Sequence, residues 1–334
     1  MLEVARVFGK MMEVGWRPRR SVVFASWDGT QYNQVGPTEF VEEAGKAVGA
    51  SVLAYVNLGA AVAGARFTAS GSPALQSVLA SVLGRVNHPL THQPLNATWA
   101  APHMPAPKAE GAHAPFQFHA GVSSLEIAFE GGKKRSPHHS CYDTFARVKD
   151  VLDPSFLHHE ALARVVALLL VELADTDIAP LSMADYARAL ANYTADLKAW
   201  VHTKEAGAKK DKGKKGVLDL VPLTKAVATA QGHMAKFSGR KEAWMDKNAE
   251  GSFVQNDDWA VANRRSRSQR MGNFDKHLAD AGSGLPARGW FKHAIFSPRV
   301  WPSVPFFLSP LFPLPPFFPP SFCLLLTCLW LGGG

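Results

Sequence analysis

Apolar residues three and four positions apart recur along this sequence, and they predict most of its helices. The pair Asp153-Pro154 predicts the start of the most apolar helix, because aspartate caps a helix and proline fits its first turn. Ser182 and Asp185 form a predicted capping box in the same way. The predicted helices cover residues 1–13, 38–48, 73–83, 156–174, 182–197 and 220–237.

Short apolar runs between these helices predict β-strands over residues 22–25, 51–57 and 122–129. The first run lacks polar alternation, which is typical of a parallel strand that is buried on both faces. Helices that alternate with strands predict an α/β fold. Ligands and catalytic groups in such folds lie where the parallel strands end, so the loop 27–31 is the predicted functional loop.

Residues 86–115 change in composition toward proline, histidine, alanine and asparagine, which predicts a long loop. Histidines in this stretch follow no regular spacing and have no cysteine or carboxylate cluster beside them. We therefore interpret them as solvated loop residues rather than metal ligands. They are His88, His92, His103 and His113.

Composition adds limits on size and chemistry. The 334 residues are enough for two domains. The net charge of +8 comes with locally clustered lysines rather than a basic stripe with interleaved aromatic residues, so nucleic acid is not a predicted partner. Cys141, Cys323 and Cys328 are too few and too scattered for a disulfide framework or a thiolate zinc site. No secretory leader or membrane-spanning segment is predicted.

The first predicted strand and the loop after it carry a family resemblance. The residues that match are Arg19, Arg20, Ala25, Ser26, Trp27, Asp28, Tyr32, Gly36, Thr38 and Glu39. In this order and spacing they resemble the zinc exopeptidases of the glutamate carboxypeptidase and transferrin receptor family. The segments 54–57, 113–125, 138–144 and 284–298 resemble further motifs of the same family.

The resemblance also implies which residues would carry the chemistry. The family places a glutamate base at the position of Thr30, and carboxylate zinc ligands at the positions of Gln31 and Gly59. A threonine hydroxyl is a poor base near neutral pH, and neither an amide nor a glycine supplies a charged ligand. His139 is the family ligand that this sequence keeps. The family uses two zinc ions, whereas no cofactor is expected in this chain.

The resemblance implies an incomplete zinc-exopeptidase α/β domain, with a mixed sheet and flanking helices, followed by an all-α dimerisation domain. We expect the peptidase-like part to cover 1–180, without the first strands of its sheet, and the helical domain to cover 181–301. Residues 302–334 are a proline-rich apolar tail that we interpret as disordered or as a gene-model artefact.

We expect a catalytically inactive homologue that acts as a homodimer through 181–301. The alternative is an incomplete sequence of an active, membrane-anchored di-zinc carboxypeptidase or aminopeptidase, which would take a peptide substrate. Family members are typically single-pass membrane proteins of the vacuole or the cell surface. The sequence leaves the location of this chain, and any substrate-binding residue, open.

Overall fold

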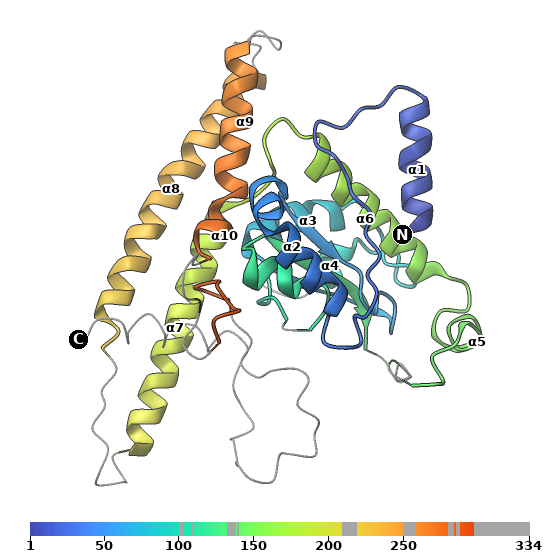
Figure 1. The fold of residues 1–334 in the computed structure, drawn as a ribbon, viewed down its shortest axis with the longest axis horizontal. Coiled ribbons are helices and arrows are strands. Elements are labelled where there is room, and N and C mark those ends of the chain that lie inside the picture. The colour runs from blue at the N-terminus through green and yellow to red at the C-terminus, as the bar shows by residue number, and fades with distance from the viewer. Residues whose placement is uncertain are drawn as a thin grey trace.

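The computed structural model describes residues 1–99, 103–108, 110–131, 138, 140–208, 219–249, 258–279, 284 and 288–296. A small sheet with flanking helices lies beside two long helices, α7 (Met183–Ala208) and α8 (Val221–Ala249), which pack along one another (Figure 1). The predicted α/β class with a following helical part is therefore confirmed. The tail 302–334 and the retained family ligand His139 lie outside the described residues.

The sheet has three described strands, β1 (Tyr55–Asn57), β2 (Arg66–Gly71) and β3 (Ser124–Glu130), in the order β1-β3-β2. β1 runs parallel to β3, with Asn57 opposite Glu126, and β2 runs antiparallel to β3. The predictions over 51–57 and 122–129 are thus confirmed, although β1 is shorter than expected. The sequence signal missed β2 because its small and polar residues give little strand propensity.

The predicted strand over 22–25 is wrong. Residues 21–27 form neither a helix nor a strand, and they pair with no strand in the described part of the chain. Apolar residues alone do not make a strand, because the backbone must also find a neighbouring strand to bond with. Here the Arg20 N–H donates instead to the Ala174 carbonyl at 2.9 Å, so this segment is fixed by a helix end.

Helices account for most of the remaining described chain, and the predicted ones over 1–13, 38–48, 73–83 and 156–174 are confirmed with shifted ends. The flanking α-helices are α1 (Leu2–Glu13), α2 (Val35–Ser51), α3 (Gln76–Leu83), α4 (Leu95–Thr98), α5 (Phe145–Arg147) and α6 (Leu157–Asp175). After α8 come α9 (Asp258–Gly272) and α10 (Phe274–His277). Single turns of other helix types are η1 (Pro73–Leu75), η2 (Pro115–His119) and η3 (Val148–Leu152).

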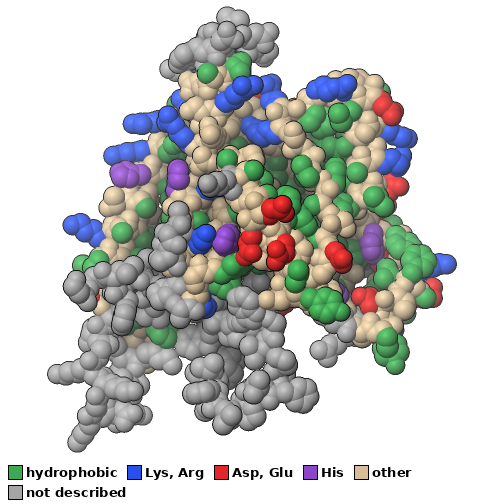
Figure 2. Space-filling view, in the orientation of Figure 1, with side chains coloured by type: hydrophobic (Ala, Val, Ile, Leu, Met, Phe, Trp, Pro, Cys, Tyr) green, Lys and Arg blue, Asp and Glu red, His purple; other side chains and the backbone are tan. Residues whose placement is uncertain are grey.

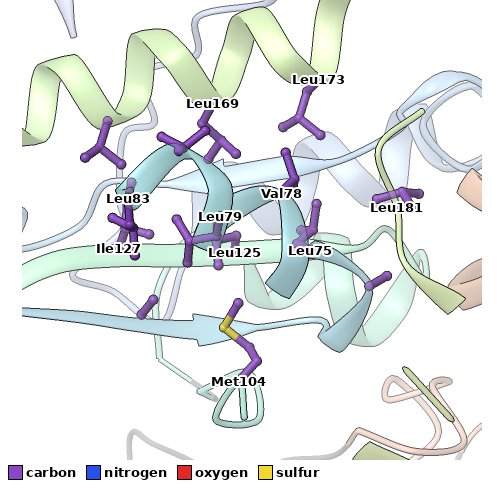
Figure 3. Packing of buried hydrophobic residues seen from close by; sticks show 14 of the residues in the cluster. Leu75, Val78, Leu79, Leu83, Met104, Leu125, Ile127, Leu169, Leu173 and Leu181 are labelled. Carbon is purple, nitrogen blue, oxygen red and sulfur yellow. The ribbon is translucent and has the colours of Figure 1, made fainter. Parts of the chain in front are cut away.

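The main hydrophobic core lies between β3, α3 and α6. Figure 3 shows Leu169 and Leu173 of α6 pointing toward α3, with the strand residues Leu125 and Ile127 on the other side of α3. All four side chains are buried, as the helical and alternating patterns predict. Burying an apolar side chain of this size stabilises the fold by about 1.5 to 3 kcal/mol. This packing fixes the sheet against which the candidate site is built.

The last described segment returns to this core. Phe291 and Phe296 are buried in the same cluster as the sheet residues, and the backbone N–H groups of Lys292 and His293 both donate to the Phe118 carbonyl. Residues near the end of the helical part are therefore in direct contact with the α/β part. A boundary between two independently packed cores is not visible in the described residues.

Candidate functional site

The loop after residue 26 is held against β1 by aromatic side chains. The Trp27 indole N–H donates to the Tyr55 hydroxyl at 2.9 Å, and Tyr55 stacks on Phe116 with ring centroids 4.3 Å apart. Phe40 of α2 completes the cluster against Trp27 at 5.0 Å. Aromatic contacts of this kind add to the free energy of burial, so the loop is anchored at its start.

The loop then closes into the start of α2. The Gly36 N–H donates to the Asp28 carbonyl at 3.2 Å, and a Cβ atom at Gly36 would lie 2.2 Å from that oxygen. Only glycine allows this close approach. The family-matching residues Asp28 and Gly36 therefore have a structural role in this chain, which is to set the path of the loop into the helix.

Thr30 and Gln31 lie within this closed loop. Thr30 is half-buried and its carbonyl accepts from the Gln34 N–H at 3.1 Å, whereas Gln31 is exposed. The backbone of the loop thus makes a polar turn that needs no metal to hold it. Neither position carries a carboxylate that could act as a base or as a charged ligand.

Gly59 follows the carboxyl end of β1 and faces two polar side chains. A Cβ atom at Gly59 would lie 3.5 Å from the Asn57 amide nitrogen and 3.6 Å from a Glu126 carboxylate oxygen. Asn57 donates to that same Glu126 oxygen at 3.2 Å. The structure therefore brings Gly59 to the polar edge where the parallel pair β1 and β3 ends.

A lysine supplies the positive charge at this edge. The Lys108 ammonium lies 3.5 Å from Glu126 and 3.2 Å from Glu130. Burial lowers the pKa of Lys108, but the two carboxylates outweigh it and the pKa is raised. No local sequence pattern marks Lys108, Glu126 or Glu130, because the cluster depends on how strand β3 and the 103–108 segment come together.

His113 lies beneath the same edge and is fully buried. Its Nε2 is 3.0 Å from the Lys108 carbonyl, which can only accept, so Nε2 carries the ring proton. Burial lowers the pKa of His113, which keeps the imidazole neutral. The prediction that His113 is solvated is wrong, because this backbone hydrogen bond offsets the cost of burying the ring.

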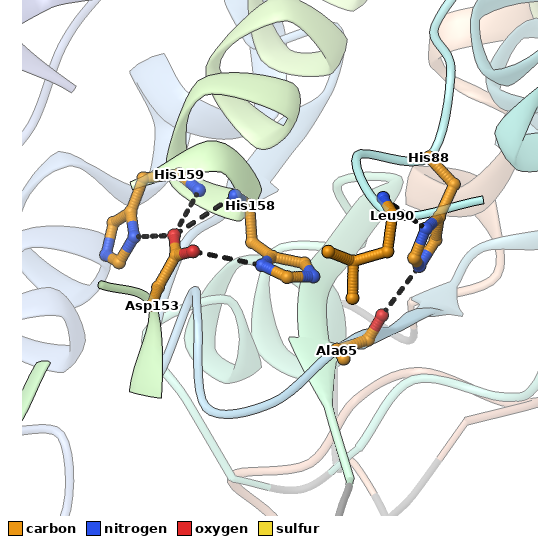
Figure 4. A network of polar contacts seen from close by, with 6 residues as sticks. All are labelled: Ala65, His88, Leu90, Asp153, His158 and His159. Carbon is orange, nitrogen blue, oxygen red and sulfur yellow. Dashed lines mark hydrogen bonds and ion pairs between the residues drawn. The ribbon is translucent and has the colours of Figure 1, made fainter. Parts of the chain in front are cut away.

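His88 is a second correction to the predicted solvated histidines. It is buried, its Nε2 lies 2.9 Å from the Ala65 carbonyl, and its Nδ1 accepts from the Leu90 N–H (Figure 4). The same Nδ1 also accepts from the Thr91 N–H. These contacts use both ring nitrogens to fix the loop. His92 and His103 are exposed, as predicted.

Asp153 organises two further histidines at the start of α6. Its carboxylate accepts from Nδ1 of His158 at 3.0 Å and of His159 at 2.7 Å, and from both of their backbone N–H groups (Figure 4). Burial raises the pKa of Asp153, but these hydrogen bonds outweigh it and lower the pKa to about 2. The helix begins at Leu157 with Phe156 at its N-cap, so the prediction of Asp153 as N-cap and Pro154 as the first helical residue is wrong, although the Asp153 carboxylate still accepts from two N–H groups of the first turn.

A buried carboxylate joins the helical part to the sheet. Asp275 of α10 accepts from the hydroxyls of Ser72 at 2.7 Å and Ser123 at 2.6 Å, and Nε2 of His293 lies 3.6 Å from its other oxygen. Nδ1 of His293 accepts from the backbone N–H groups of residues 295 and 296. The serines therefore contact the aspartate and not the histidine, which is not the order of a nucleophile, a base and an orienting acid.

The surface around these sites is mixed in charge. In Figure 2 acidic side chains gather near the middle of the face, over α2, where Glu39, Glu42 and Glu43 are exposed. The Trp290 indole donates to Glu42 at 2.6 Å, which ties the last described segment to this acidic helix. Lys and Arg side chains lie mostly toward the upper edges of that view.

Among the residues that the structure describes, no three His, Cys, Asp or Glu side chains are placed to share a metal ion. In the same part of the chain, no helix combines the length and the apolar character needed to cross a bilayer.

Comparison with known proteins gives one domain match and several curated relatives. Residues 218–313 match the model of the transferrin receptor-like dimerisation domain. A probable glutamate carboxypeptidase of Zea mays is 30% identical over 89% of this chain and 40% of its own length. Transferrin receptor protein 2 of Homo sapiens is 32% identical over 61% of this chain and 28% of its own. An inactive zinc metalloprotease of Schizosaccharomyces pombe is 24% identical over 90% of this chain and 36% of its own length. The chain spans less than half the length of these relatives.

Proposed function

Because this chain belongs to the glutamate carboxypeptidase and transferrin receptor-like family, we propose that it is a catalytically inactive homologue that acts as a dimerising interaction protein. The observation that carries the proposal is the chemistry at the family's site positions. Thr30 replaces the base, and Gln31 and Gly59 replace two carboxylate ligands. Loss of the base and of charged ligands would remove both proton transfer and metal affinity.

The described site does not fit the two zinc ions that the family implies. Zinc sites need three or four nitrogen, sulfur or carboxylate ligands around each ion. Gln31 is an exposed amide, and Gly59 offers no side chain. The nearby carboxylate Glu126 is already paired with the Lys108 ammonium at 3.5 Å, whose positive charge would repel a divalent cation. We therefore derive no reaction step through zinc for this chain.

The name of one relative is consistent with a loss of activity in this family. One relative, which matches 90% of this chain, carries the name of an inactive zinc metalloprotease. Another is named as a transferrin receptor protein. In this proposal the fold persists as a scaffold and the helical part supplies self-association. The match to a transferrin receptor-like dimerisation domain over 218–313 supports this role for α8 and α9.

The first experiment measures metal content and turnover on the same purified sample. We expect no stoichiometric zinc by plasma mass spectrometry and no hydrolysis of acetyl-aspartyl-glutamate or amino-acid p-nitroanilides. The matched variant restores the family residues with Thr30→Glu, Gln31→Glu and Gly59→Asp. More zinc in this variant than in the parent would show that the substitutions at these three positions remove zinc binding. Two zinc ions per parent chain with turnover would contradict the proposal and favour an active exopeptidase.

The second experiment tests self-association. Sedimentation velocity of the whole chain over a range of concentrations is expected to show a dimer. Circular dichroism of the same sample serves as the folding control. A folded sample that stays monomeric at every concentration would contradict the dimerising part of the proposal and would leave the catalytic part unaffected.

A further inference from the structure

A cavity of about 590 Å³ lies where the α/β part meets the two long helices. Its walls come from α3, the end of α6, the start of α7 and the middle of α8. Most of the wall is apolar, and one lysine lines it among the described residues. The lining includes Ser81, Ile178, Leu181, Ala184, Phe237, Ser238, Lys241 and Glu242.

Lys241 presents its amine to this cavity in a fixed position. Its Nζ donates to the Leu181 carbonyl at 3.1 Å, and both residues line the cavity. A carbonyl oxygen occupies one N–H bond and leaves the nitrogen lone pair of the neutral amine available. Burial lowers the pKa of Lys241, and Glu242 offsets this only in part. A larger share of this amine is therefore neutral near physiological pH than for an exposed lysine.

Two groups that assist amine chemistry line the same cavity. Ser238 precedes Lys241 by three positions, so both lie on one face of α8. Glu242 also lines the cavity and is exposed, so its carboxylate can exchange protons with water. An amine, a hydroxyl and a carboxylate that share one cavity are the groups that carbonyl addition and loss of water require.

We propose that Lys241 reacts with small aldehydes that bind in this cavity and holds them as imines. The neutral Nζ attacks the aldehyde carbon, a C–N bond forms, and the carbonyl oxygen takes a proton to give a carbinolamine. The Ser238 hydroxyl donates a hydrogen bond to that oxygen. Glu242 carries this first proton from the nitrogen to the oxygen and then carries the second nitrogen proton to the departing hydroxyl, so water leaves and the C=N bond forms. No oxidant or reductant is consumed.

The apolar walls select the class of aldehyde. Ile178 and Phe237 offer hydrophobic surface to the body of the ligand, while the reactive carbon meets Lys241. An aldehyde with an aromatic or short aliphatic body gains free energy from burying that body. A strongly charged aldehyde gains less, because it would lose its hydration at the apolar wall. This site is separate from the loop 27–36 and from the edge at Gly59, so its test is independent of the proposed function.

The experiment traps the imine on the whole chain. The protein is incubated with benzaldehyde and sodium cyanoborohydride near neutral pH, which reduces an imine to a stable secondary amine, and labelled peptides are quantified by mass spectrometry. We expect Lys241 to be labelled several-fold faster than Lys236, which is exposed on the same helix. We also expect the Lys241 rate to saturate with benzaldehyde concentration, as binding before reaction requires.

Lys276 separates the effect of the cavity from the effect of burial. Burial lowers the pKa of Lys276 too, but it is not a lining residue of this cavity. Its labelling should therefore rise linearly with benzaldehyde. Equal rates for Lys241 and Lys236, or no saturation at Lys241, would overturn the proposal.

Two variants fill the cavity without changing the lysine. Ala184→Trp and Ser81→Trp place an indole at exposed lining positions on different helices. Each is expected to abolish saturation at Lys241 and leave labelling of Lys236 unchanged. Circular dichroism checks that each variant folds, and either folded variant is sufficient. Unchanged saturation in a folded variant would overturn the proposal.

Discussion

The Ser123 hydroxyl donates to the Asp275 carboxylate at 2.6 Å, although 152 positions separate the two residues. Asp275 is 1% exposed and Ser123 is 2% exposed, so the contact is fully buried. It joins the start of β3 to α10 and thereby ties the helical part to the sheet. A buried carboxylate keeps its charge only where hydrogen bonds replace its lost hydration.

Asp275→Asn is expected to lower the free energy of unfolding by about 2 to 4 kcal/mol, because an amide nitrogen would replace either the oxygen that accepts from both serines or the charged oxygen that faces Nε2 of His293. Urea denaturation followed by fluorescence measures this change. Asp150→Asn is the matched control, since Asp150 is exposed, and it should leave the midpoint unchanged. Equal midpoints for Asp275→Asn and the parent would show that the buried contact contributes little.

Asp153 gives a prediction about acid unfolding. Its folded pKa of about 2 lies below the unfolded value of ~3.9, so its contribution to stability is fully present above the unfolded pKa. That contribution is lost as the pH falls from about 4 to about 2. Asp153→Asn should therefore be less stable than the parent at neutral pH. The difference in urea midpoint between the two proteins should shrink across this acid window, and a constant difference would contradict the assigned pKa.

Two glycines of α2 form a matched pair. A Cβ atom at Gly36 would lie 2.2 Å from the Asp28 carbonyl, whereas one at Gly45 would meet nothing within 4 Å. We expect Gly36→Ala to destabilise the protein by about 1 to 3 kcal/mol through this overlap. Gly45→Ala should stabilise it by about 0.5 to 1 kcal/mol, because alanine favours the helix. Thermal unfolding measures both changes in stability. A loss of stability in both variants would contradict the prediction that a Cβ atom at Gly45 meets no neighbouring atom.

Gly59 tests the charge at the edge of the sheet. A carboxylate introduced by Gly59→Asp would lie beside Glu126. The free energy of unfolding of Gly59→Asp should therefore be lower by up to about 1 kcal/mol than that of Gly59→Asn, whose side chain has the same shape without the charge. Like charges raise the pKa of a carboxyl group, so the two variants should become equally stable as the pH falls below about 4. Urea denaturation of the two variants at neutral pH and below about pH 4 measures the difference in their stability. If Asp is the more stable variant at neutral pH, Lys108 would already balance an additional negative charge.

The sequence by itself determined the helices α1, α2, α3, α6, α7 and α8, the strands β1 and β3, and the substitutions at the family's site, whereas α4, α5, α9 and α10 were not predicted. Periodic apolar residues define α3 and α6 locally, because helical spacing places them on one face whatever packs against them. The identities of Thr30, Gln31 and Gly59 already exclude the family's base and two of its charged ligands at those positions. The chemistry of these side chains is set by the sequence and does not depend on how the chain folds.

Tertiary structure alone decided which polar groups meet. His88 and His113 follow no spacing rule, and their burial depends on carbonyls that distant turns bring within reach. Residues 22–25 have a strand-like composition, but pairing requires a neighbouring strand that a local pattern cannot supply. The contact between Ser123 and Asp275 forms only when α10 packs against the sheet. Hydrogen bonds between residues far apart in sequence leave no periodic signal, and so the structure is needed to find them.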